Sequence, residues 1–365
     1  EFTAAALASI LLLTGCIAST EPEPEWSRYR ISYMDTFDTI VQNVGYTHTG
    51  EDFDRYSEEM HELLLHYNQL FDRYNSYEGM NNVKTINDNA GIAPVKVDEP
   101  LIDLLEQCVE WEEQSQGAVN VCMGSVLEIW HEYRERYIGT ENGELPPMEL
   151  EAAAQHTDIS SLVIDREAGT VYLTDPEASL DLGAVAKGYA TEQITQKLYA
   201  DGFTSFAMSS GGNVRVMDAP ADGSKTAWVI GIQDPSASME SGDYVDSVIA
   251  NNISVVTSGD YQRYYMVDGV KVHHIIDGET LMPADRFSSV TIVCEDSGLA
   301  DMLSTALFIL PMEEGKALAE RYGAEVMWIE TNGTVTCTDG LIPLLKERGG
   351  ATSVPPSAQE ESGKE

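Results

Sequence analysis

Two side-chain oxygens stand four residues apart in the segment 301–305 (DMLST). A helix is expected over residues 299–310, which puts Asp301 in its first turn and Thr305 on the same face. A carboxylate and a hydroxyl are hard oxygen ligands that suit Mg²⁺, since this ion takes few protein ligands and completes its shell with water and phosphate oxygens. The alternative interpretation is an aspartate that interacts with the helix dipole, beside a threonine without a special role.

A second segment, residues 179–189 (SLDLGAVAKGY), combines an acid, two glycines and a lysine. A strand is expected to end near Leu180, and a helix to begin a few residues later. Anionic groups gather at helix N-termini because unpaired N–H groups and a partial positive charge lie there. Lys187 adds a point cation. Taken alone, glycines at such a turn more often serve close packing.

Three more segments carry polar residues at strand ends. The run 209–213 (SSGGN) is typical of a hairpin turn, and 256–261 (VTSGDY) could hold a ligand through hydroxyl and backbone contacts. In 273–277 (HHIID), neighbouring residues of a strand face opposite ways, so only one of the two histidines can share a pocket with Ile276. Two histidines do not make a zinc site, and a strand histidine is more often a surface residue or a satisfied one.

The elements that position these residues follow from hydrophobic periodicity. Apolar stripes predict helices over 51–74 and 99–116 and make the first half mostly helical. The second half alternates hairpins, expected over 161–174, 264–276 and 324–338, with helices, expected over 185–199, 299–310 and 312–322. Strands joined mainly by tight turns, with helices packed to one side, predict an α+β fold with mixed or antiparallel sheets.

Charge limits the partners of the chain. Its 365 residues include 21 Lys and Arg against 61 Asp and Glu, a formal net charge of −40. This excludes a nucleic-acid binder, because phosphate backbones are recognised through Lys and Arg. It does not imply disorder, since 43% of the residues are hydrophobic. The same charge repels phosphate-bearing ligands, so we expect a bound cation to mediate their binding.

The two ends of the chain differ from its body. A short apolar run over 4–13 is followed by Gly15-Cys16, which resembles a bacterial lipobox; the run is too short to span a bilayer, which needs about 20 residues. We expect a signal peptide over 1–15, truncated at its start, then lipidated Cys16 and a tether over 16–28, which place the protein outside the cytoplasm on the bacterial membrane. The alternative is an apolar arm with an accidental Gly-Cys. A single domain over 29–346 and a disordered acidic tail over 347–365 complete the predicted organisation.

The other four cysteines show no spacing typical of a zinc site. Cys108 and Cys294 lie in apolar runs, so we expect buried free thiols rather than a disulfide framework.

Taken together and in this order, these segments resemble the flavin transferase family often called ApbE, the FAD:protein FMN transferases. The resemblance covers residues 34–345, and the family signature Asp-Leu-Gly-x-x-Ala-Lys-Gly is present without change from Asp181 to Gly188. The other matching segments are Met34-Asp35-Thr36, Phe71-Asp72-Arg73-Tyr74, Ile86-Asn87, Gly117-Ala118-Val119-Asn120-Val121-Cys122, Ile129-Trp130, the Thr-Ser-Gly-Asp-Tyr run, His-Ile-Ile-Asp, and Asp301 with Thr305. The resemblance implies an ApbE-like fold.

The resemblance also implies a site. Mg²⁺ would be bound by the backbone oxygen of Ala184 and the side chains of Asp301 and Thr305, helped by Ser304. His274 is the position that the family suggests as catalytic base, with Lys187 beside the phosphates. The implied FAD contacts come from Met34, Tyr74, Ala118, Val119, Asn120, Asp181, Lys187 and Ile275.

The implied reaction cleaves FAD into AMP and FMN and attaches FMN as a phosphoester to a Thr or Ser of a partner. No acceptor-type segment occurs in this chain, so the partner is expected to be a separate, exported redox protein. Two alternatives stay open: a Mg²⁺-dependent FAD pyrophosphatase with water as acceptor, and a lipoprotein that binds FAD without chemistry.

Three stretches depart from the family pattern. Val119-Asn120 stands in place of Phe-Asp, Val121-Cys122 in place of Pro-Thr, and Asp277-Gly278-Glu279-Thr280-Leu281 in place of Asp-Pro-x-Thr-Gly. None of these touches the implied metal ligands, so we expect FAD and Mg²⁺ binding to survive these changes.

Overall fold

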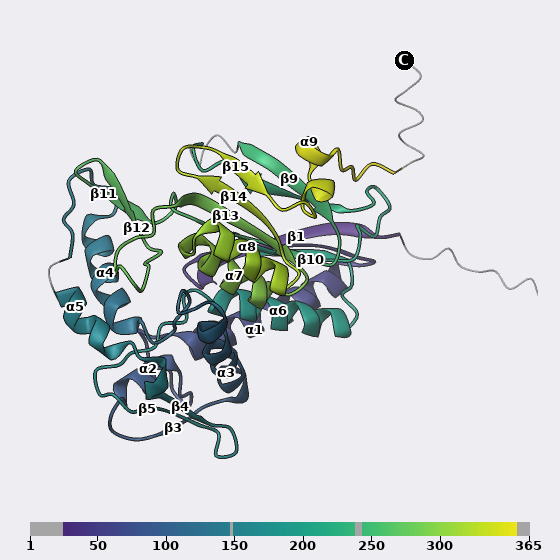
Figure 1. The fold of residues 1–365 in the computed structure, drawn as a ribbon. Helices are drawn as coiled ribbons and strands as arrows, with labels where there is room; N and C mark the ends of the chain where they lie inside the picture. The colour runs from purple at the N-terminus through teal and green to yellow at the C-terminus, as the bar shows by residue number, and fades with distance from the viewer. Residues whose placement is uncertain (1–24, 147–148, 238–242, 356–365) are drawn as a thin grey trace, which may run out of the picture.

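Eight antiparallel strands form the main sheet of the computed structural model, in the order β1-β2-β6-β7-β10-β13-β14-β15 (Figure 1). The strands are β1 (Ser27–Thr36), β2 (Thr39–Thr47), β6 (Phe206–Ser210), β7 (Asn213–Met217), β10 (Ile253–Gly259), β13 (Phe287–Cys294), β14 (Glu325–Glu330) and β15 (Val335–Cys337). Gly211 and Gly212 join β6 to β7 with φ of 56° and 99°, which confirms the hairpin turn predicted at 209–213.

The structure describes residues 25–146, 149–237 and 243–355. The predicted signal peptide, Cys16 and most of the tether therefore lie outside the described residues, as does the tail beyond 355. Within the described ranges, no helix is long and apolar enough to cross a membrane.

Both faces of the main sheet are buried, because apolar residues alternate in their direction along the central strands. Val256 and Ile292 belong to the core on one face, whereas Val255 and Val293 belong to the cluster on the other. The first face is covered by α1 (Gly50–Phe71), α6 (Ala186–Ala200), α7 (Ser297–Ile309) and α8 (Met312–Arg321). The second is covered by the strand pair β8 (Trp228–Gln233) and β9 (Tyr244–Ala250) and by the segment of η3 (Ile342–Leu344). The short α9 (Lys346–Gly349) packs on β9 and η3. The expected α+β fold, with helices on one side of the sheet, is confirmed.

Two smaller groups of elements complete the fold (Figure 1). The first group is a three-stranded sheet with two helices: β3 (Val95–Lys96), β5 (Thr170–Leu173), β4 (Leu162–Asp165), α2 (Val83–Asp88) and α3 (Glu99–Gln114). The second has its own hydrophobic cluster, which includes Trp130, Tyr265 and Val272. It consists of α4 (Gly124–Tyr137), α5 (Glu149–Ala153), η1 (Ala154–His156) and the hairpin of β11 (Tyr264–Val267) and β12 (Val270–His273), with η2 (Ile159–Ser161) next in the chain.

The predicted helices and hairpins are all found, with bounds that differ by a few residues. The expectation that the first half is mostly helical is wrong at its start, where β1 and β2 form one edge of the main sheet. Helix α4 was not predicted. The four cysteines in the described residues are free thiols; Cys108 and Cys122 are buried, whereas Cys294 and Cys337 are partly exposed.

Residues 347–355 differ from the predicted disordered tail. The buried carboxylate of Asp246 accepts the backbone N–H of Glu347 at 2.9 Å and pairs with Arg348 at 2.9 Å. Further along, Ser353 accepts the N–H of Thr226 at 2.9 Å. A polar segment is thus ordered through one buried acid, which composition does not reveal.

Helices α6 and α7 cross at Gly188, where there is no room for a side chain. A Cβ at this position would lie 2.3 Å from the Cβ of Asp301 and 2.4 Å from the backbone oxygen of Ser297. The glycine therefore allows the two helices of the predicted site to touch.

Gly188→Ala should lower the free energy of unfolding by about 2–3 kcal/mol, because overpacking at the crossing outweighs the gain in helix propensity. Gly315→Ala, within α8, is the matched control, since its Cβ would meet Leu307 only at 3.3 Å. Urea unfolding measures both variants. Equal stability of the two would contradict the close contact.

Candidate functional site

Asp301 is buried at the crossing of α6 and α7, with 6% of its surface exposed. Its Oδ2 accepts the backbone N–H of Gly188 at 2.7 Å. Burial raises the pKa of Asp301, whereas the charge of Lys187 and this hydrogen bond act in the opposite direction. Among the described residues no salt bridge reaches this carboxylate, so its negative charge is buried with one backbone donor and a nearby lysine.

The contact with Asp301 leaves the carbonyl of Ala184 without its helical partner. In a helix, the N–H of Gly188 would donate to the oxygen four residues earlier, which is that of Ala184. Here this N–H donates to Asp301, while the N–H groups of Ala186 and Tyr189 bond to Leu182 and Val185. Among the described residues no hydrogen bond to the Ala184 oxygen is found, because the donor that a regular helix would give it bonds to the buried carboxylate instead. A free carbonyl oxygen and a buried carboxylate fit a divalent cation.

The two hydroxyls on α7 have different surroundings. Ser304 is buried, donates to the backbone oxygen of Asp301 at 2.8 Å and contacts the hydroxyl of Ser258 at 2.7 Å. The single hydroxyl proton of Ser304 is donated to the Asp301 oxygen, so in the contact between the two serines Ser258 donates and Ser304 accepts. Thr305, one turn after Asp301, is only partly buried. Thr305 is thus the better placed of the two for a ligand, and Ser304 mainly joins α7 to β10.

The two histidines at the end of the hairpin β11–β12 have different surroundings. His273, the last residue of β12, is buried and satisfied, since its Nε2 donates to the carbonyl of Ala284 at 2.7 Å and its Nδ1 accepts the N–H of Ile275 at 3.2 Å. His274 follows the strand, is partly buried, and its Nδ1 has no hydrogen-bond partner among the described residues. Burial and nearby cations, among them Lys187, lower the pKa of His274 to about 3. Its imidazole is therefore neutral at pH 7.

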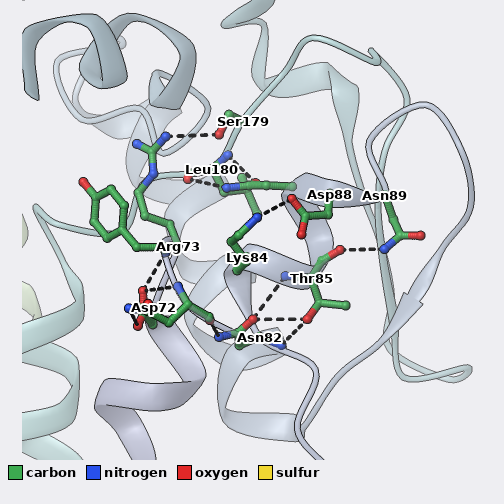
Figure 2. Close-up of polar contacts among 12 residues, drawn as sticks. Asp72, Arg73, Asn82, Lys84, Thr85, Asp88, Asn89, Ser179 and Leu180 are labelled. Atoms are coloured by element: carbon green, nitrogen blue, oxygen red, sulfur yellow. Dashed lines mark hydrogen bonds and ion pairs between the residues drawn. The ribbon is translucent and has the colours of Figure 1, made fainter. Parts of the chain in front are cut away.

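Asp181, predicted to contact FAD, is held by a buried arginine that the sequence reasoning did not single out. The guanidinium of Arg73 lies 2.6 Å from Asp181 and 2.6 Å from Glu128 of α4, and donates to the backbone oxygen of Gly124 at 3.2 Å. Figure 2 shows Arg73 reaching Ser179, at 3.3 Å. Arg73 thus joins the end of α1, the start of α4 and the segment around Asp181. The strand expected to end near Leu180 is not formed, since this stretch has only an isolated bridge between Ser179 and Met123.

The same segment is fixed from α2. The side chain of Asn87 donates to the oxygen of Leu180 at 3.0 Å and accepts its N–H at 2.7 Å, and Figure 2 shows these bonds at Leu180. Helix α2 is itself stabilised by a capping box between Asn82 and Thr85. These side chains fix the backbone that leads into the predicted binding loop.

The other predicted FAD contacts lie in different surroundings. Tyr74 is 46% exposed and its ring lies 5.2 Å from that of His131; Met34 on β1 is 75% exposed. Val119 and Ile275 are buried, and Ala118 is partly buried. The amide of Asn120 is engaged within the fold, since it donates to Thr157 at 2.8 Å and accepts from Cys122 at 2.8 Å. Charge interactions link Tyr74 to Asp181, and Lys187 to both His274 and Asp301.

The altered loop after the candidate base contains a non-glycine residue in the left-handed region. Leu281 has φ of 59° at the position where the family pattern has glycine. Asp277 accepts the N–H of Glu279 at 2.9 Å, and Trp130 of α4 donates to the oxygen of Leu281 at 3.0 Å. The loop is therefore held in its conformation by α4.

Comparison with known proteins gives a consistent result. A family model described as the ApbE family matches residues 29–328. The "FAD:protein FMN transferase" of Treponema pallidum is 34% identical over 275 residues, which cover 72% of this chain and 74% of that protein. The protein of the same name from Vibrio cholerae is 28% identical over 334 residues, 89% of this chain and 92% of that one. The crystal structure of an ApbE protein from Thermotoga maritima superposes with a TM-score of 0.75 at 28% identity, over 87% of this chain and 99% of that one.

Replacement of Arg73 by glutamine should lower the free energy of unfolding by about 2–3 kcal/mol, because Asp181 keeps its charge at a mostly buried position without a cation. Arg166→Gln is the matched control: its side chain is 45% exposed and pairs with Asp103 and Glu106, so we expect a loss below about 1 kcal/mol. Chemical denaturation compares the two. A loss for Arg73→Gln no larger than the control's would show that the buried pairs do not stabilise the loop.

Proposed function

The chain belongs to the ApbE family, and on that premise we propose that it transfers FMN from FAD to a hydroxyl of a separate protein with the help of Mg²⁺. The observation that carries the proposal is the crossing of α6 and α7, where Gly188 donates to Asp301 and the carbonyl of Ala184 has no hydrogen-bond donor among the described residues. The similarity to the named transferases over most of the chain supports the reaction class.

The residues at this crossing fit Mg²⁺ by their chemistry. The donor set is a carboxylate of Asp301, the carbonyl of Ala184 and the hydroxyl of Thr305, all hard oxygens. A buried carboxylate whose pKa is raised by burial also has much to gain from a divalent cation. When bound, Mg²⁺ would neutralise the phosphate oxygens that gain charge as the pyrophosphate breaks.

In the proposed reaction the acceptor oxygen forms a bond to the phosphorus of the FMN half, and the bridging P–O bond breaks. AMP leaves with the bridging oxygen, and the proton of the acceptor hydroxyl passes to a base. His274 is suited to receive it because its imidazole is neutral and its Nδ1 is unpaired. Burial is the main cause of its low pKa and nearby cations add to it; a bound pyrophosphate would neutralise the cations, so FAD binding should remove that part of the shift.

The charge of Lys187 affects both Asp301 and His274. This residue lies in the first turn of α6, and its Nζ donates to the oxygen of Gly183 at 3.2 Å. A flexible ammonium at this position can follow the phosphate charge as the bond breaks. Arg73 and Asn87 act indirectly, since they position the loop from which Lys187 and Ala184 come.

The function is tested by incubation with FAD, Mg²⁺ and a candidate exported redox protein. We expect the acceptor to gain the mass of one FMN through an acid-stable bond, with one AMP released per transfer. Rapid AMP and free FMN formation without any acceptor would instead indicate the pyrophosphatase. Unchanged FAD with several acceptors would overturn both activities.

Asp301→Asn should abolish the dependence of transfer on Mg²⁺ and reduce its rate at least about a hundredfold. The amide oxygen can still accept from Gly188, so the fold is kept while the charge is lost. Asp296→Asn is the control on the same helix: Asp296 is the exposed N-cap that accepts from Leu299 at 2.8 Å, and asparagine caps equally well. Retained Mg²⁺-dependent transfer in Asp301→Asn would remove this carboxylate from the metal site.

Attachment to the membrane through Cys16 remains a proposal from the sequence alone. Expressed with a complete signal peptide, the protein should fractionate with membranes and carry a lipid mass on Cys16, whereas Cys16→Ser should be found in the soluble fraction. Membrane association of Cys16→Ser equal to that of the parent would contradict the lipid anchor.

A further inference from the structure

Three cations gather around His274 in a chain with a large excess of acids. Lys187, Arg134 and Arg263 all lie close enough to lower the pKa of this histidine. Among the described residues, none of the three forms a salt bridge, whereas Arg73, Arg166 and Arg348 each do. With 61 acidic residues and only 21 basic ones, three basic side chains grouped without a carboxylate partner require an explanation.

The hairpin β11–β12 brings Arg263 next to His274. Tyr264 and His273 form the last pair of its antiparallel register, and Arg263 and His274 are the residues that adjoin this pair at the same end of the hairpin. One N–H of Arg263 donates to the oxygen of Asp38 in the β1–β2 turn at 3.2 Å, which leaves the rest of its guanidinium for another partner.

Helix α4 brings Arg134 to the same place. The helix packs on the hairpin through their common cluster, with the ring of Tyr137 5.8 Å from that of Tyr265. Arg134 is partly buried and lies 2.8 Å from Nδ1 of His131. Arginine has no acceptor, so His131 accepts here and is neutral. The ring of His131 in turn lies against exposed Tyr74.

The cluster concentrates positive charge near His274. Burial and the charge of Arg263 lower the pKa of Arg134, whereas Tyr74, Glu135 and Asp181 act on it in the opposite direction, and both arginines lower the pKa of His274. Desolvated like charges in one place are destabilising unless a ligand supplies the opposite charge. Two planar guanidinium groups match the oxygens of a phosphate, which they can bind through paired hydrogen bonds.

We propose that Arg134 and Arg263 form a phosphate subsite beside His274 that binds phosphate oxygens of the dinucleotide, next to the ring platform of Tyr74 and His131. This rests on the proposed function and adds to it two binding residues from α4 and from the start of β11. Its two arginines come from α4 and from the residue before β11, whereas Ala184 precedes α6 and Asp301 lies on α7.

The test compares ligands with and without phosphate. Purified Arg134→Gln and Arg263→Gln are titrated in EDTA with FAD, AMP, inorganic pyrophosphate and riboflavin, with flavin fluorescence and calorimetry as readouts. We expect each variant to bind FAD and pyrophosphate about tenfold more weakly, and the double variant weaker still. Riboflavin, which has no phosphate, should bind as it does to the parent protein.

Arg136→Gln is the matched control. This arginine is on the same helix, is exposed, and lies 5.2 Å from the ring of Tyr133, so its replacement should leave all four affinities unchanged. Arg134→Lys keeps the charge and should recover part of the pyrophosphate affinity, which covers the case in which the glutamine variant is unstable.

Unchanged binding of FAD and pyrophosphate in the double variant would overturn the subsite, as would an equal loss for riboflavin, which would indicate a structural role. These measurements do not depend on transfer. If phosphate ligands bind through the arginines but no acceptor gains FMN, the proposed function fails and the subsite stands.

Discussion

The structure depends on the close crossing of α6 and α7, where one backbone N–H bonds to a buried carboxylate. Because Gly188 has no side chain, its N–H can donate to Asp301 rather than to the carbonyl one turn earlier. This single exchange of partners ties the two helices together and leaves a backbone oxygen unpaired. A helix with ordinary hydrogen bonding at its start would leave Asp301 buried with no donor, which is far less favourable.

The arrangement of charge follows a consistent pattern around this crossing. Acidic residues dominate the chain, and two buried arginines each have carboxylate partners of their own. Arg73 pairs with Asp181 and Glu128, and Arg215 lies 3.2 Å from Glu192. The cations near His274 lack such partners in the described part of the chain. A protein with a net charge of −40 can attract a phosphate-bearing ligand only through local fields of this kind, since its overall field repels one.

The sequence predicts correctly those elements whose patterns depend only on residues that are near one another in the chain. The apolar stripe of α1, the turn at Asp268-Gly269 and the Asp-Leu-Gly segment depend on neighbours a few residues away, and the structure has a helix, a hairpin and a turn into α6 there. The strand expected to end near Leu180 is wrong, since that stretch forms only an isolated bridge between Ser179 and Met123. Arg73 was not singled out because its role depends on Asp181 and Glu128, 108 and 55 residues away. The unpaired carbonyl of Ala184 leaves no trace in the sequence, since it follows from a contact between two helices. The order of residues 347–355 was likewise hidden, because average composition says nothing about one anchoring acid.

The separate hydrophobic cluster of α4 and the β11–β12 hairpin has a further consequence. Groups of elements with their own small core can open as cooperative units at a lower free energy than global unfolding. His274, Arg134 and Arg263 belong to this unit or to its ends, whereas Lys187 and Asp301 belong to the helices on the main sheet. A ligand that contacts both the α4/β11–β12 unit and the helices on the main sheet would stabilise the packing of the one against the other. Substrate binding and the packing of these two parts would then be thermodynamically linked.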